Sequence, residues 1–474
     1  MAKAEFHEFT MTPERRVWKS LSALGLAAVL AWGAPAAGQI LGGGLPVGIP
    51  SGLPSGLPAG LGGVPRTVLP ARPVPPSALA EPASQVAGAA DQLVSGALND
   101  VRRLTVERLL REHSGLVEAD DHGQPVVRGE ALAIDVDRDT LDRLRRAGFT
   151  VRAQVGLRSL GLKTAVLGLP KGLSAVEAIR RLRELDPAGQ YDFDHLYQAA
   201  GAVDETPGAT RTAGGTAGAD GRGLKVGMVD GSAAASRPAL SGVRLIQRAF
   251  APGGARVTAH ATAVASLISG AAGRFHGAAP GATLLVADVY GPTPAGGSAQ
   301  AIATALDWLA QDKAPVVNIS LVGPPNLLLG ASVRALIAKG VLVVAPVGND
   351  GPAAPPLYPA AYPGVVAVTG VDAARHVLPE AGRSGHVDFS APGADMAAAG
   401  VTGGLVAVRG TSFAAPVVAG RLAILQARSG SAAALDILAR QAVDLGVPGP
   451  DPIYGRGLVG EDVRTDPARI ARRR

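Results

Sequence analysis

The C-terminal half of the chain contains five runs of apolar residues, and segments with helical periodicity lie between them. Each run is apolar almost throughout rather than at every second position, which is typical of strands that are buried on both faces. We therefore predict an α/β fold with a doubly wound, mostly parallel sheet. In such sheets, functional residues lie just beyond the carboxyl ends of the strands. The runs are Leu224–Val229, 283–290, 315–321, 341–347 and 365–371.

Three polar residues stand at positions where a reactive group is expected. Asp230 directly follows the first run, His260 opens a helical segment, and Ser412 precedes the apolar run of "GTSFAAPVVAG". Taken singly, they are ordinary: a turn residue, a structural histidine and a helix cap. Taken together, they give the chain order Asp, His, Ser of a catalytic triad. An α/β-hydrolase would run Ser, Asp, His around a G-x-S-x-G turn, whereas here the serine lies in G-T-S-F-A.

Five segments resemble the signature segments of the subtilisin-like serine proteases, the subtilases of peptidase family S8. They are "HATAVASLI", "VVNISLVGP", "VGND", "FSAPG" and "GTSFAAPVVAG", all between Leu224 and Asp462. The resemblance implies a serine endopeptidase in which Ser412 attacks the peptide carbonyl and His260 transfers the proton. Asp230 would orient the imidazole and stabilise its charged form.

The resemblance also implies the surroundings of these three residues. Asn349 would donate a side-chain N–H to the oxyanion, beside the backbone N–H of Ser412. Ser320, Leu321 and Val322 would line the cleft and pair with the substrate backbone as an added strand.

Three positions depart from the family pattern. Val322 replaces the usual glycine, which predicts a narrow pocket for P1, the residue that supplies the carbonyl of the cut bond; with the apolar Val347 nearby, we expect small or medium apolar residues there. Gly231 and Ser232 follow Asp230, so we expect the hydroxyl partner of this carboxylate to be displaced by one residue. Ala261 follows His260 where glycine is usual, and neither of these last two changes removes a reacting group.

A second module precedes the catalytic half. Its predicted elements follow the order β-α-β-β-α-β, an α+β ferredoxin-like arrangement, with a capping box formed by Ser174 and Glu177. The resemblance implies a propeptide that assists folding and occupies the cleft, with its final strand as a product-like tail. Cleavage would then fall between Tyr197 and Gly223. A permanent accessory domain is the alternative.

The chain divides into six predicted segments. Residues 1–38 have the order of a signal peptide, with a basic stretch, twelve apolar residues and then small residues, so we expect export to the periplasm or the exterior. A retained signal would instead tether the protein to the membrane, and Met11 is an alternative start. The other segments are a Gly/Pro/Ala-rich spacer (39–90), a helix with the ferredoxin-like propeptide (91–200), a linker with the maturation site (201–223), the catalytic domain (224–462) and a basic tail (463–474).

Composition limits the remaining classes. The absence of cysteine excludes disulfides, thiolate nucleophiles and cysteine-ligated metals. The net charge of +6 is dispersed, which argues against nucleic-acid binding. We expect no cofactor and assign no metal ligands, although structural calcium is common in the family. The expected partners are peptide or protein substrates and the chain's own propeptide; the alternative function is a peptide-binding protein without turnover.

Overall fold

The computed structural model describes residues 95–98, 100–208, 221–383 and 385–467. The predicted signal segment and spacer lie outside these residues. None of the helices in the described part has the length and apolar character that a membrane crossing requires.

The centre of the catalytic half is a seven-stranded sheet in which every pair of neighbours is parallel. Its order is β10-β13-β9-β14-β16-β17-β18, with β9 inside the sheet. All five predicted strands are present, and the fold class is confirmed. The two edge strands, β10 and β18, were not predicted because they are short and β10 is half polar. The bounds are β9 Lys225–Asp230, β10 Leu245–Ala249, β13 Thr283–Asp288, β14 Val316–Ile319, β16 Leu342–Pro346, β17 Val366–Val371 and β18 Phe389–Pro392.

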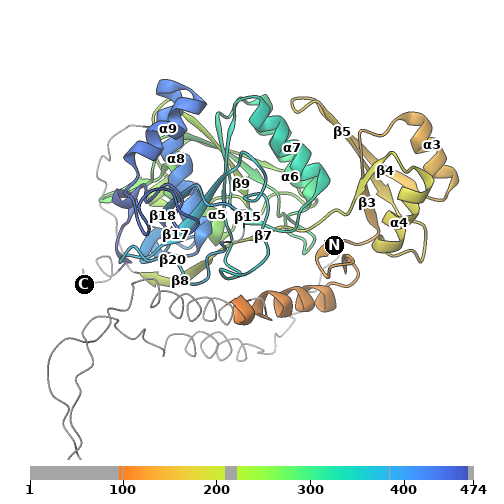
Figure 1. The fold of residues 1–474 in the computed structure, drawn as a ribbon, viewed down its shortest axis with the longest axis horizontal. Coiled ribbons are helices and arrows are strands. Elements are labelled where there is room, and N and C mark those ends of the chain that lie inside the picture. Colours follow the sequence, from red (N-terminus) through yellow and green to blue (C-terminus); the bar gives the residue numbers. More distant parts are fainter. Residues whose placement is uncertain (1–94, 99, 209–220, 384, 468–474) are drawn as a thin grey trace, which may run out of the picture. The chain divides into compact units, whose positions relative to one another are not determined.

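Helices cover both faces of this sheet (Figure 1). On one face, α5 (Ala259–Ser269) and α8 (Thr411–Ser429) pack with Met228 and other strand residues in one apolar core. On the other, α6 (Ala299–Gln311) and α7 (Leu327–Ala338) pack with Val229 in a second core. α9 (Ser431–Gln441) packs on α8. Because successive strand residues point to opposite faces, both faces need apolar side chains, which explains the unbroken apolar runs.

The upstream module has its own antiparallel sheet of order β4-β5-β3-β6, with the connectivity of the split βαβ arrangement. Leu144, Phe149 and Ile179 lie in its apolar core. The predicted capping box is present, because Ser174 Oγ accepts from Glu177 N and Glu177 Oε2 accepts from Ser174 N. The bounds are β3 Glu130–Ile134, α3 Arg138–Arg146, β4 Thr150–Leu157, β5 Leu162–Gly168, α4 Ala175–Leu185 and β6 Gln190–Asp192. A hairpin, β1 Val117–Ala119 with β2 Pro125–Val127, precedes it.

Three boundaries differ from the predictions. The last strand of the module ends at Asp192 rather than Tyr197, because the next residues bind the catalytic domain instead of β3. The predicted linker contains β8 (Ala202–Gly208), which pairs with β20 (Leu405–Arg409), since backbone pairing needs no particular side chain. The predicted basic tail begins too early: Val463 is buried, and Arg464 donates to Asp372 O at 2.6 Å.

A helical stretch over residues 100–112 contacts the catalytic domain. Val101 is 61% exposed, whereas Val106 is buried. Arg102 Nη1 pairs with Asp350 Oδ2 at 2.5 Å, and just upstream Ser95 Oγ accepts from Ala353 N at 2.8 Å. Polar contacts therefore help to hold this segment.

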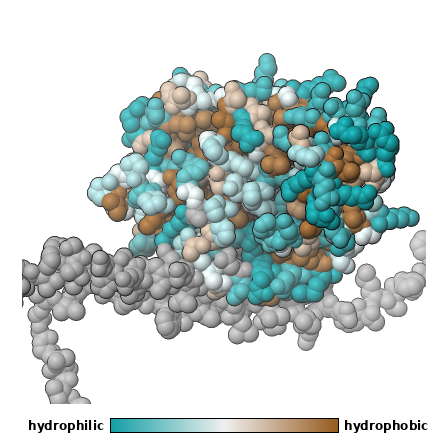
Figure 2. Space-filling model, turned by 45° about the vertical axis from the view of Figure 1, so that its right-hand side comes forward, coloured by the Kyte–Doolittle hydropathy of each residue, from teal (hydrophilic) through white to brown (hydrophobic). Residues whose placement is uncertain are grey.

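The outer surface mixes residue types. Figure 2 shows one face on which hydrophilic residues predominate, with hydrophobic residues scattered between them. Several large apolar side chains of the described residues are exposed. Examples are Val101, Leu185, Val257, Leu327 and Val447.

Two buried carboxylates join the upstream module to the catalytic domain. Asp192 Oδ2 accepts from Leu327 N at 2.7 Å, and Asp194 Oδ1 accepts from Gln300 N at 2.9 Å. These N–H groups lie in the first turns of α7 and α6, where helices have unpaired donors and a positive dipole end. Even so, burial raises the pKa of Asp194 to about 7. Binding of the upstream module to the catalytic domain is therefore less favourable in free energy when the carboxyl group of Asp194 is ionised.

We expect the stability of a Ser412→Ala chain to fall as pH rises from about 4 to about 7. Between these values the carboxyl group of Asp194 keeps its proton in the folded chain and loses it in the unfolded chain, whose pKa is about 3.9. The slope from one such group is at most about 1.4 kcal/mol per pH unit. Urea unfolding across this range, compared with Asp194→Asn, measures it.

Asp142→Asn, a change at an exposed carboxylate, is the control. Burial also raises the pKa of Asp192, so part of the slope should survive in Asp194→Asn. An identical slope in Asp194→Asn and the parent chain would contradict the prediction.

Candidate active site

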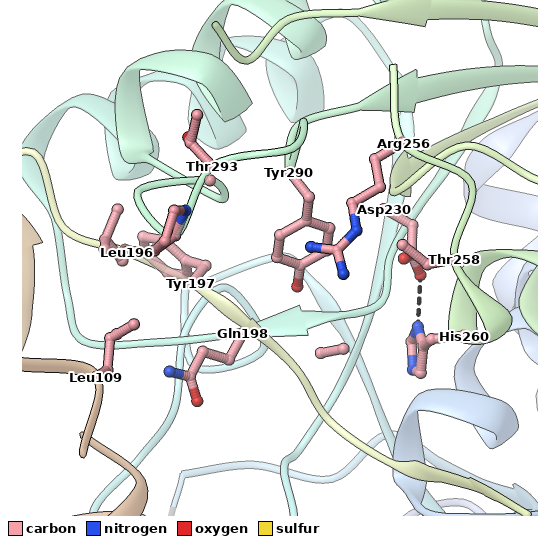
Figure 3. Close-up of a pocket in the computed structure, with 13 residues that line it drawn as sticks. Leu109, Leu196, Tyr197, Gln198, Asp230, Arg256, Thr258, His260, Tyr290 and Thr293 are labelled. Atoms are coloured by element: carbon pink, nitrogen blue, oxygen red, sulfur yellow. Dashed lines mark hydrogen bonds and ion pairs between the residues drawn. The ribbon is translucent and has the colours of Figure 1, made fainter. Parts of the chain in front are cut away.

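The three candidate triad residues meet at the carboxyl edge of the sheet. Asp230 ends β9, His260 lies in the first turn of α5, and Ser412 lies in the first turn of α8. His260 Nδ1 lies 2.8 Å from Asp230 Oδ2, the contact that Figure 3 marks with a dashed line, and His260 Nε2 lies 2.8 Å from Ser412 Oγ. The exposed fractions of Asp230 and Ser412 are 0% and that of His260 is 9%. The sequence-predicted residues thus form one continuous, buried hydrogen-bonded chain.

Local contacts hold the imidazole of His260 between the other two residues. Thr258 caps α5, its Oγ1 accepting from Ala261 N at 3.0 Å, which fixes the start of the helix one residue before His260. The ring of Phe413 packs against the imidazole with 5.1 Å between centroids. Asp230 uses its second oxygen, Oδ1, to accept from Gly231 N at 2.7 Å. The carboxylate is therefore paired at both oxygens.

The prediction that Ser232 supplies a hydroxyl partner to Asp230 is wrong. Ser232 Oγ donates instead to Asp288 Oδ2 at 2.8 Å. The reason is the register of the sheet, in which Asp288 at the end of β13 lies level with Asp230 at the end of β9. Asp288 also accepts from the backbone N–H groups of Ser232, Arg256, Tyr290 and Gly291. This buried carboxylate has a structural role, because it holds together the loops after β9 and β13.

Asn349 lies beside the N-terminus of α8. Its Oδ1 accepts from both N and Oγ1 of Thr411, each at 3.1 Å, which directs the amide nitrogen toward the cleft. A side chain at Gly410 would come within 2.9 Å of Asn349 Nδ2 and 3.0 Å of Ala200 O. Gly410 also has φ 137°, a conformation that favours glycine. Glycine at this position therefore leaves the space between the amide and the Ala200 carbonyl open.

A segment of the chain itself runs through this cleft. β7 (Gln198–Ala199) pairs antiparallel with β15 (Leu321–Val322), and the carbonyl of Ala200 accepts from Ser412 N at 3.1 Å. Past Gly201 the chain continues into β8. It is thus held on both sides of Ser412, as a substrate would be; the expected product-like tail would form only once this segment was cut. The bond between Ala200 and Gly201 faces the serine hydroxyl.

The predicted substrate-lining residues take different places. Leu321 and Val322 pair with Ala199 and Gln198 through their backbones. Ser320 uses its hydroxyl to donate to the carbonyl of Ser412 at 3.2 Å, and Asn318 Nδ2 donates to Ser320 Oγ at 2.7 Å. The side chain of Ser320 therefore supports the serine that was predicted to react, rather than facing the cleft.

Proline explains why this support is needed. Pro416 is the sixth residue of α8, beyond its first turn, and it has no N–H to donate to the carbonyl four residues earlier. That carbonyl belongs to Ser412, and Ser320 Oγ takes the missing donor's place. Pro416 marks the missing donor in the sequence, but the residue that replaces it, Ser320, lies between β14 and β15.

Tyr197 and Val322 shape the upstream part of the cleft. The ring of Tyr197 is buried, and its hydroxyl donates to Pro324 O at 2.6 Å. A side chain at Gly323 would meet this ring at 2.6 Å, so glycine provides the space that the ring fills. Val322 is buried beside it. Sequence reasoning missed Gly323 because its effect depends on which residue it faces.

No metal site of convincing chemistry lies near the cleft in the described residues. Among the described residues, one group of acidic and histidine side chains has its ligand atoms close enough together to hold a metal ion. It consists of Asp120, Asp121 and His122, and the last two are exposed. Asp120 is already occupied, because its Oδ1 accepts from His122 N and Gln124 N and its Oδ2 contacts His195. This group does not fit calcium, which takes six to eight oxygen ligands.

We expect Ser320→Ala to lower the free energy of unfolding by about 1–3 kcal/mol, because two buried polar groups lose their partner. Urea unfolding in a Ser412→Ala chain measures this without any reaction at Ser412. Ser429→Ala, at an exposed hydroxyl that also bonds a helix carbonyl, is the control and should change stability by less than about 0.5 kcal/mol. Equal effects of the two changes would argue against the supporting contact.

Comparison with known proteins agrees with this geometry. The model of the subtilase family matches residues 221–457, half of the chain. Subtilisin Savinase from Lederbergia lenta is 33% identical over 193 residues, which cover 40% of this chain and 70% of that protein. The minor extracellular protease Epr from Bacillus subtilis is 32% identical over 167 residues, or 34% of this chain, and the match spans about a quarter (26%) of its own length.

A solved structure shows the same fold. Fervidolysin from Fervidobacterium pennivorans, described as a keratinolytic enzyme related to subtilisin, superposes with a TM-score of 0.60 at 20% identity. The superposition covers 73% of this chain and 62% of fervidolysin. The parallel sheet, the family match over the catalytic half and the 70% coverage of a subtilisin lead to one conclusion: the chain belongs to the subtilase family of serine proteases.

Proposed function

We propose that the protein is an exported serine endopeptidase, made as a zymogen that cuts its own Ala200–Gly201 bond. One observation carries this proposal. Ser412 donates its backbone N–H to the carbonyl of Ala200 while its hydroxyl is hydrogen-bonded to His260. The scissile carbonyl, the nucleophile and the base thus lie together, with the chain uncut.

The geometry supports a two-step reaction. Ser412 Oγ attacks the carbonyl carbon of Ala200, and its proton passes to Nε2 of His260. Asp230 accepts from Nδ1 of the same ring, which keeps the correct tautomer and stabilises the imidazolium. Collapse of the tetrahedral intermediate breaks the Ala200–Gly201 bond, and the imidazolium proton goes to the nitrogen of Gly201. Water then hydrolyses the acyl-enzyme by the same route.

The negative charge of the intermediate would be met by two donors. The Ser412 N–H already contacts the carbonyl oxygen of Ala200. Nδ2 of Asn349 would be the second donor, because its amide is oriented by Thr411. The N-terminus of α8 adds its positive dipole end. One such side-chain donor contributes about 3–4 kcal/mol to the barrier in enzymes of this chemistry.

The upstream module would act as the propeptide. Its last segment lies in the cleft through β7, through Tyr197 N donating to Gly297 O at 2.8 Å, and through the buried Tyr197 ring. These contacts lie upstream of the proposed cut, so they would persist after it and keep the cleft blocked. Ala200 at P1 is a small apolar residue, which agrees with the expected preference for small or medium apolar residues.

Export rests on the N-terminal sequence, which has the order of a signal peptide. The comparison adds support, because one relative is named an extracellular protease. The proposal places the reaction outside the cytoplasm, where a blocked precursor protects the producing cell.

We expect the purified wild-type chain without its signal segment to be cut between Ala200 and Gly201, and Ser412→Ala to stay whole. Removal of a triad serine lowers rates by about 10⁶-fold. Intact-mass measurement reports the cut, and Ser241→Ala, at an exposed hydroxyl, should behave as wild type. An uncut wild-type chain that also fails to react with a fluorophosphonate would overturn the proposal in favour of a peptide-binding protein.

We expect Gly201→Ala to slow this cut by at least about 100-fold, since a 1 Å misplacement of reacting groups has that effect. A methyl group there would lie 2.4 Å from Ser412 Oγ and 2.6 Å from the Phe413 ring, so the bond has to move away from the serine. The time course of the cleaved mass measures the rate. Gly242→Ala, which meets nothing within 4 Å, is the matched control. Equal rates would place the cut elsewhere.

A further inference from the structure

A pocket of about 320 Å³ lies beside the triad, and the cleft segment leaves it unfilled. Ala199 precedes the P1 residue Ala200 and is therefore the P2 residue of the proposed cut. It presents only a methyl group to the pocket. The pocket wall includes Tyr290 and, from one side of the view in Figure 3, Arg256 with Asp230, Thr258 and His260. A longer P2 side chain would therefore have room beside the reacting groups.

Tyr290 brings an unused hydrogen-bond donor to this pocket. Its hydroxyl oxygen is buried and has no hydrogen-bond partner among the described residues. A buried polar group without a partner is costly, and such groups are rare in folded proteins. Figure 3 shows the hydroxyl directed toward the segment that carries Tyr197 and Gln198. The methyl group of Ala199 offers it nothing to bind.

Arg256 brings a positive charge on an exposed side chain. Its backbone is held in place, because its N–H donates to Asp288 Oδ2 and its carbonyl accepts from Ser232 N. Its guanidinium, however, forms no ion pair with any described carboxylate, although it lines the same pocket as Tyr290. The two nearest buried acids are satisfied elsewhere: Asp230 by His260 and Gly231, and Asp288 by its five donors.

A buried hydroxyl without a hydrogen-bond partner and an exposed guanidinium without an ion pair thus line one pocket. The complementary group is a hydrogen-bond acceptor with negative charge. We propose that this pocket is a subsite for an acidic side chain at P2, with Tyr290 and Arg256 as its specificity-determining residues. The proposal rests on the proposed function, because it takes the Ala200–Gly201 bond as the site of the cut.

The proposal also explains why the chain carries alanine there. A propeptide that filled every subsite would be hard to displace once it was cut. With Ala199 at P2, the cleft segment leaves Tyr290 and Arg256 unpartnered, so an acidic substrate has an interaction that the propeptide lacks. Exchange of propeptide for substrate is then favoured at this position.

The test places different side chains at P2 in the full chain with Ser412→Ala, where no cleavage intervenes. The measurement is hydrogen exchange of the backbone amides in residues 196–204, which reports how tightly the segment is held in the cleft. We expect Ala199→Glu to slow this exchange at least tenfold and Ala199→Lys to leave it unchanged or faster. Ala199→Gln, an acceptor without charge, should fall between Glu and Ala.

Second-site variants assign the effect to the two residues. The slowing by Ala199→Glu should be lost in Arg256→Gln and reduced in Tyr290→Phe. Arg248→Gln, the same change at an exposed arginine outside the pocket, should keep it. Equal exchange in Ala199→Glu and Ala199→Lys would overturn the proposal, and so would a slowing that persists in both Arg256→Gln and Tyr290→Phe.

A second measurement separates this proposal from the proposed function. In chains that keep Ser412, the rate at which the mass cut at Ala200–Gly201 appears should follow the same order, Glu, then Gln, then Ala, then Lys. If no chain is cut while the exchange rates follow this order, the acidic subsite stands and the endopeptidase function fails. If all chains are cut and neither measurement distinguishes Glu from Lys, the endopeptidase stands and the subsite fails.

Discussion

The rest of the site depends on the buried hydrogen bond between Asp230 Oδ2 and His260 Nδ1. Asp230 is fully buried, so without this partner its charge would be costly. The bond directs the other ring nitrogen at Ser412 Oγ, which joins β9, α5 and α8 at one point. Both faces of the sheet are covered by helices, which fixes the positions of β9, α5 and α8 around this bond.

A second constraint comes from backbone pairing. The cleft segment is held as an extra strand by β15 upstream of the Ala200–Gly201 bond and by β20 downstream of it. Backbone groups supply these bonds, so the cleft selects side chains only where they meet a wall. There are three such positions. The ring of Tyr197 fills the space at Gly323, the ring of Phe413 lies next to Gly201, and Ala199 borders the open pocket. Selectivity in this protein therefore resides in a few side-chain positions.

Much of the fold and of the candidate site followed from local sequence patterns. The five apolar runs predicted their strands because burial on both faces requires apolar residues at every position. The triad candidates and Asn349 were found because their motifs are short and contiguous. Edge strand β10, strand β8 inside the predicted linker and the place of Ser232 were not found. Each depends on a partner from elsewhere in the chain: β13, β20 and Asp288.

The sequence by itself determined the parallel sheet, the order of Asp230, His260 and Ser412, and membership of a protease family, since these are written in periodicity and motif. Only the tertiary structure decided which bond of the chain faces the serine, why Pro416 needs Ser320, and that Tyr290 and Arg256 share an unfilled pocket. The physical reason is that a hydrogen bond or a steric contact between distant residues depends on how strands and helices pack. No local pattern carries that information.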